Sequence, residues 1–163
     1  MSRLRELDIS QYKVNDATIS ALEDYLRHRS QQLAGGVVKV NRTMRQLTLN
    51  HCGVTGTQAA QLFRAIGENN GMSISLNGNP LEEGLGDLAS AIQSQKGPEE
   101  LHMDMIEFRD EAKFRRLLRA FSTARYLSVL SLVGTTPIPS IGSALHSDTV
   151  GTIEVFFLSL IHI

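Results

Sequence analysis

Several features of secreted and membrane proteins are missing from this sequence. Its 163 residues include one cysteine, Cys52, which excludes an internal disulfide framework and favours a reducing compartment. The first ten residues carry charged side chains and no apolar segment, so we expect no signal peptide. The longest apolar run, 155–163, is about half the length of a membrane-spanning helix. The sequence therefore predicts a cytoplasmic protein without a membrane span.

An excess of charge of either sign is also missing. Lys and Arg together number 16 and Asp and Glu number 17, which gives a formal net charge of −1 at pH 7. A nearly neutral chain has no bulk attraction to nucleic acid or to an acidic membrane. Tryptophan is absent, but 42% of the residues are hydrophobic, enough for a substantial core. We expect a single domain over residues 1–163.

Motifs of catalytic and cofactor sites are missing as well. The chain has no phosphate loop, because Gly84 and Gly86 lie in an expected helical stripe instead of between a strand and a helix. Adjacent His51 and Cys52 should point in opposite directions, which favours a buried structural thiol over a metal site. A cluster of carboxylates is interpreted as a solvated helix start: Asp104, Glu107, Asp110 and Glu111. We expect no enzymatic activity and no cofactor.

What the sequence does contain is a spaced apolar pattern between Met44 and Val54. Apolar residues occupy positions 1, 4, 6, 9 and 11 of this stretch, matching the template L-x-x-L-x-L-x-x-(N/C)-x-L. Leu47 and Leu49 are two residues apart, so both point to one side of a short strand. A single unit of this kind cannot bury its own apolar side and needs stacked copies.

The copies are present along the chain. The ninth position of the template falls at residues 12, 52, 79, 106, 135 and 158, with steps of 40, 27, 27, 29 and 23. An apolar stripe at helical spacing lies between most of these strand signals. Residues 32–42 lengthen the first step and are interpreted as a surface loop, or alternatively as a contact element at the repeat edge. Residues 150–163 are interpreted as a truncated last repeat of a longer array.

This pattern, over roughly residues 4–133, resembles the ribonuclease-inhibitor-like subclass of leucine-rich repeats. The subclass includes ribonuclease inhibitor, Ran GTPase-activating proteins and the CARMIL regulators of actin capping. Ribonuclease inhibitor is rich in cysteine, and this chain has one. The resemblance therefore implies a CARMIL-like or Ran GTPase-activating-protein-like array of about five to six repeats, and it is specific for fold rather than function.

The expected fold class is α/β, a leucine-rich-repeat horseshoe with parallel strands on the concave face and helices on the convex face. A period of 27 residues leaves room for a full helix in each repeat. The interior rows are predicted to contain Leu47, Leu49, Ile74, Leu76, Leu101, Met103, Leu130 and Leu132.

Residues that flank the buried positions of each strand should point into the concave opening. These positions include several acids and no Lys or Arg, which predicts a mildly acidic groove. We expect a scaffold that binds a protein partner with a basic patch, and the resemblance to CARMIL-like arrays implies a role in actin-capping regulation. The predicted contact residues are Gln46, Thr48, Asn50, Ser73, Ser75, Asn77, Glu100, His102 and Asp104.

Two other functions stay open at this point: a GTPase-activating protein for a Ran-type small GTPase, and an inhibitor that occupies an enzyme from the concave face.

A basic helical face, interpreted as solvated exterior, is formed by Arg115, Arg116 and Arg119. The apolar tail 156–163 predicts self-association through an uncovered strand. Asn41 begins a glycosylation sequon, which no secretion signal supports.

Overall fold

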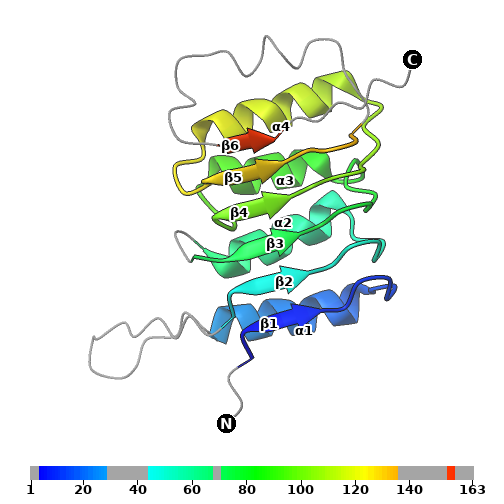
Figure 1. Cartoon of the computed structure of the whole chain (residues 1–163), viewed down its shortest axis with the longest axis vertical. Coiled ribbons are helices and arrows are strands. Elements are labelled where there is room, and N and C mark those ends of the chain that lie inside the picture. Colours follow the sequence, from blue (N-terminus) through cyan, green and yellow to red (C-terminus); the bar gives the residue numbers. More distant parts are fainter. Residues whose placement is uncertain (1–3, 29–43, 68–70, 136–153, 157–163) are drawn as a thin grey trace.

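The computed structural model describes residues 4–28, 44–67, 71–135 and 154–156. Short strands in these residues form one parallel sheet that follows chain order (Figure 1). The strands are β1 (Glu6–Asp8), β2 (Gln46–Thr48), β3 (Ser73–Ser75), β4 (Glu100–His102), β5 (Val129–Ser131) and β6 (Glu154–Phe156). Four described helices lie along one face of the sheet: α1 (Asp16–His28), α2 (Gly56–Ile66), α3 (Leu85–Gln93) and α4 (Glu111–Thr123).

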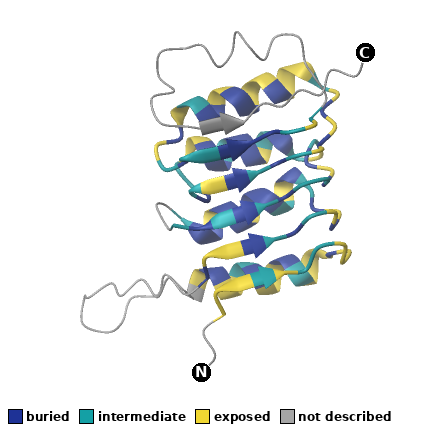
Figure 2. Ribbon diagram, in the orientation of Figure 1, coloured by how far each residue is buried: buried dark blue, intermediate teal, exposed yellow. Residues whose placement is uncertain are grey.

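The core lies between the sheet and these helices (Figure 2). The central residues of neighbouring strands are paired, Leu47 with Ile74, Ile74 with Leu101, and Leu101 with Leu130. All eight residues predicted for the interior rows are at most 2% exposed. The strand register and the α/β class with parallel strands are therefore confirmed.

Local sequence explains where the helices begin. Asn15 caps α1 by accepting a hydrogen bond from the Thr18 amide at 2.9 Å. Thr55 and Gln58 form a reciprocal capping box at the start of α2. Asp110 caps α4 by accepting from the Lys113 amide at 3.1 Å. Each cap satisfies amides that the first helical turn cannot pair internally.

The turn after each strand repeats at the level of single residues. A backbone with positive φ recurs at the same place in successive units: Gln11, His51, Gly78, Met105 and Gly134. The amide at this place donates to the turn of the next unit, for example from His51 to the Asn77 carbonyl at 2.9 Å. The same bond joins Gly78 to the Asp104 carbonyl at 2.9 Å. The turns that follow the strands are thereby stacked on one another at the carboxyl ends of the strands.

The structure differs from the expected pattern at Tyr12, which is 68% exposed although its template position is an interior one. The equivalent residues reach back to the preceding unit, as Asn79 does when it donates to the Leu49 carbonyl at 2.7 Å. Tyr12 belongs to the first described unit and has no such neighbour among the described residues. Helix α3 ends at Gln93, and the backbone of Gln95 adopts a positive φ of 59° that does not continue the helix.

Several predicted features fall outside the described residues: the insertion 32–42, the sequon at Asn41, most of 150–163 and the tail beyond Phe156. Within the residues that are described, no helix combines the length and the apolar character needed to cross a membrane.

Candidate functional site

The face of the sheet opposite the helices, here called the open face, presents the predicted contact residues of the strands. Side chains alternate along a strand, so the neighbours of buried Leu47, Ile74 and Leu101 point away from the helices. The strand pairing places Gln46, Ser73 and Glu100 in one lateral row, and Thr48, Ser75 and His102 in a second. Neighbouring strands are about 4.8 Å apart, so the six side chains share one continuous polar surface.

The other three predicted contact residues follow the strands and form a third row with a structural role. Asn50 Oδ1 accepts from the Ser75 hydroxyl at 2.6 Å and from the Asn77 amide at 2.9 Å. Asn77 Oδ1 in turn accepts from the Asp104 amide at 2.8 Å. These residues therefore connect successive turns, besides being partly accessible from the open face.

Asp104 continues this row at the next turn. Its Oδ1 atom accepts from the Ser131 hydroxyl at 2.6 Å and from the Val133 amide at 2.8 Å. Ser131, which we expected to face the opening, is only 6% exposed because it is held against this carboxylate. An asparagine performs the same task at positions 50 and 77, so Asp104→Asn removes the charge and keeps the acceptor. Asp104→Lys would also break both hydrogen bonds.

Negative charge on the open face comes from Glu6, Asp8 and Glu100, all exposed, and from half-buried Asp104. The side-chain and backbone hydrogen bonds from Ser10 lower the pKa of Asp8, so this carboxylate stays ionised well below neutral pH. None of the positions in the three rows is Lys or Arg. The open face over β1 to β4 is thus polar and acidic.

Cys52 and His51 point in opposite directions, as predicted. The Cys52 thiol is 1% exposed and donates to the Ile9 carbonyl at 3.2 Å, while His51 is exposed. Burial raises the pKa of the Cys52 thiol, which disfavours the reactive thiolate at neutral pH. Among residues 4–28, 44–67, 71–135 and 154–156, no group of three or more His, Cys, Asp or Glu could hold a metal ion.

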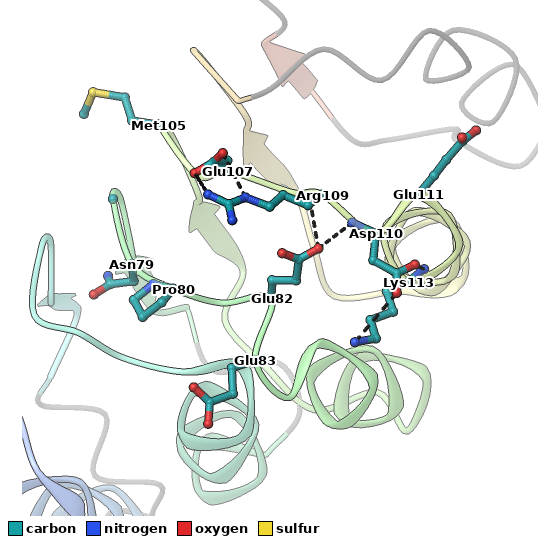
Figure 3. Close-up of a pocket in the computed structure, with 11 residues that line it drawn as sticks. Asn79, Pro80, Glu82, Glu83, Met105, Glu107, Arg109, Asp110, Glu111 and Lys113 are labelled. Carbon is teal, nitrogen blue, oxygen red and sulfur yellow. Dashed lines mark hydrogen bonds and ion pairs between the residues drawn. The ribbon is translucent and has the colours of Figure 1, made fainter.

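A concave region lies at the carboxyl ends of β3 and β4 (Figure 3). This loop-edge groove encloses about 1090 Å³ and is lined by Gly78, Asn79, Pro80, Glu82, Glu83, Met105, Glu107, Arg109, Asp110, Glu111 and Lys113. The Glu82 carboxylate accepts from the amides of Arg109 and Asp110 at 2.8 and 2.5 Å, which fixes the approach to α4. Sequence reasoning missed this role of Glu82 because the contact crosses between units.

Charges in the loop-edge groove are largely matched with one another. Arg109 donates two hydrogen bonds to Glu107, both at 3.0 Å, and they lower the pKa of that carboxylate. Lys113 lies 3.7 Å from the Asp110 carboxylate. The predicted helix start is confirmed for Asp110 and Glu111, which cap α4 and occupy its first turn. These exposed ion pairs contribute little to stability.

The basic exterior is arranged along α4. Arg115 pairs with Glu111 one helical turn earlier, and Arg116 donates to the Ser90 hydroxyl of α3 at 3.2 Å. Arg119 is exposed. The positive residues therefore lie on the helical side of the molecule, and the acidic rows lie on the open face.

No protein-family model matches the chain, and no curated protein matches it.

Proposed function

We propose that this chain is a leucine-rich-repeat array that binds a protein partner through the open face of its sheet and performs no chemistry itself. The observation that carries the proposal is the lateral alignment of polar side chains in rows across β2, β3 and β4. The recurring turn and the step of 27 residues between Cys52 and Asn79 support a repeat architecture. The buried thiol agrees with a reducing compartment such as the cytoplasm.

Preorganisation supports binding at this face. The rows rest on Leu47, Ile74 and Leu101, which are at most 1% exposed. Hydrogen bonds through Asn50 and Asn77 fix the turns that border the rows. Because these backbone positions are already fixed, the chain would lose little conformational entropy when a partner docks.

The charge of the face indicates the chemistry of the partner. Glu100 is exposed on the central part of the sheet, and Asp104 follows it on the same face. A partner patch with Lys or Arg would complement these groups, accelerate association and make it sensitive to salt. The partner proposed here is a folded protein with a basic patch.

Affinity capture with variant baits tests this proposal. The Glu100→Lys/Asp104→Asn pair should lose the captured partner and slow its association by about tenfold at low salt, because the steering charge is reversed or removed. The matched control is Arg115→Glu/Arg116→Glu on α4, which should capture the partner normally. Circular dichroism melts should show that both variants fold.

The opposite pattern would defeat the proposal. Partner loss confined to the Arg115→Glu/Arg116→Glu bait would move the binding surface to the helices. Unchanged association of the Glu100→Lys/Asp104→Asn bait at low salt would contradict the proposal that the partner carries a basic patch attracted to these carboxylates.

The loop-edge groove favours one second candidate, a GTPase-activating protein for a Ran-type small GTPase. Such an activity needs a solvent-facing site on the loops at one edge of the units, and the groove with Arg109 is at such an edge. A GTP-hydrolysis assay with this class of GTPase separates the two functions. The scaffold proposal predicts unchanged hydrolysis, whereas an acceleration that Arg109→Ala removes would support the second candidate.

A further inference from the structure

The first strand of the sheet has one side available for pairing. β1 pairs with β2 and with no other strand among the described residues (Figure 1). The Arg5 carbonyl accepts from β2 at 3.1 Å, and the Ile9 amide donates to β2 at 3.1 Å. Backbone groups alternate in direction along a strand, so those of Glu6 and Asp8 point to the opposite side. They form a row of donors and acceptors along the sheet edge.

Apolar side chains gather at this same end of the molecule. Among the described residues, the exposed large hydrophobic side chains are Leu4 at 39%, Tyr12 at 68%, Tyr25 at 39% and Met105 at 57%. All but Met105 belong to the unit of β1 and α1. Leu7 is half-buried, whereas its counterpart Leu47 in β2 is 0% exposed. A strand placed beside β1 would cover Leu7 as β2 covers its other side.

Two carboxylates at the edge indicate which strand fits there. Glu6 and Asp8 are exposed on the open face, with Leu7 between them on the helical face. A second copy of the chain that paired through β1 would place these carboxylates against one another, which is destabilising. A strand with positive side chains at the matching positions would instead form opposite-charge pairs.

We infer that β1 accepts an extended segment of another protein, which adds to the sheet as an outer strand with Lys or Arg beside Glu6 and Asp8. The residue between the two basic ones is apolar, because it lies beside Leu7 as Leu47 does on the other side. Backbone hydrogen bonds supply the affinity of such strand addition, and the alternating side chains supply its specificity. The recognised pattern is basic, apolar, basic, on a surface distinct from the rows of β2 to β4.

Two labelled peptides test the charge pattern. The first is Ser-Thr-Lys-Val-Lys-Thr-Ser, and the second replaces both lysines with glutamate. Fluorescence anisotropy with the full chain should show at least about tenfold tighter binding of the lysine peptide. Glu6→Lys should weaken that binding by a similar factor and remove most of the preference between the two peptides, because Asp8 keeps its negative charge. Asp24→Lys, which reverses an exposed charge on α1 of the same unit, is the control that should change neither affinity.

A backbone variant tests the strand pairing itself. Glu6→Pro removes an amide that points to the free side of β1 and leaves the bonds to β2 possible, so lysine-peptide binding should be lost. Glu6→Gln, which keeps the amide, should retain weakened binding. Absence of saturable lysine-peptide binding, or binding that Glu6→Pro does not change, would overturn the inference. Self-association of the native chain that Glu6→Pro abolishes would overturn it too, because the occupant would then be a second copy.

Discussion

Replacing Asn79 with alanine is expected to lower the free energy of unfolding by about 4 kcal/mol. The Asn79 side chain is 3% exposed and bridges two units through five hydrogen bonds, four of them to buried backbone groups. Its Oδ1 atom accepts from the amides of Cys52 and Val54 at 2.9 and 3.1 Å. Its Nδ2 atom donates to the carbonyls of Leu49 and Leu76 at 2.7 and 2.8 Å. Alanine would leave all four backbone groups buried without this partner.

Asn77 provides the matched control, two residues earlier in the chain. It is half-buried, and its side-chain oxygen accepts one hydrogen bond, from the Asp104 amide at 2.8 Å. Asn77→Ala should therefore lower the free energy of unfolding by about 1 kcal/mol, because water can reach the partly buried Asp104 amide. Urea unfolding of the native chain, Asn79→Ala and Asn77→Ala measures both losses in the free energy of unfolding. Equal losses for the two alanine variants would contradict the buried-network role of Asn79.

The second large effect is expected at Gly84, where α2 approaches the loop before α3. Gly84 has a φ of +80°, and a Cβ built there would lie 2.4 Å from the backbone nitrogen of Thr57. Gly84→Ala therefore combines a left-handed backbone with a clash against the first turn of a helix, which side-chain rotation cannot relieve. We expect a loss of about 3 kcal/mol or more in the free energy of unfolding.

Gly53→Ala separates these two contributions. Gly53 has a similar φ of +73°, but a Cβ there would meet nothing within 4 Å. Gly53→Ala should lower the free energy of unfolding by about 1 kcal/mol, because only the left-handed backbone conformation is unfavourable for alanine there. Thermal melts of the native chain, Gly84→Ala and Gly53→Ala test whether the first variant loses more stability than the second. If Gly84→Ala is no worse than Gly53→Ala, the close approach between the units is not rigid.

The sequence predicted the positions that repeat within one unit. Leu47, Ile74 and Leu101 were identified from their spacing because burial of alternate strand residues depends on local periodicity. The buried position of Asn79 also followed from its place in the template. The polar residues of the strands were likewise placed on one face by alternation alone.

Contacts between units could not be predicted in this way. The Asn50 and Asp104 side chains were expected to be free for a partner, yet their oxygens hold the next turn. The Glu82 carboxylate and the approach at Gly84 link residues that are far apart in the sequence. Such contacts depend on side-chain rotamers and loop backbone, which spacing does not specify. Tyr12 was misplaced because its template position needs a preceding unit.

Thiol footprinting tests the central claim, binding through the open face, most directly. Ser73→Cys puts a thiol on this face, and Ser20→Cys puts one on exposed α1; native Cys52 is 1% exposed and should react slowly. The captured partner at saturation should slow maleimide modification of Ser73→Cys by about tenfold and leave Ser20→Cys unchanged. Protection of Ser20→Cys, with Ser73→Cys reacting at its free rate, would contradict the account.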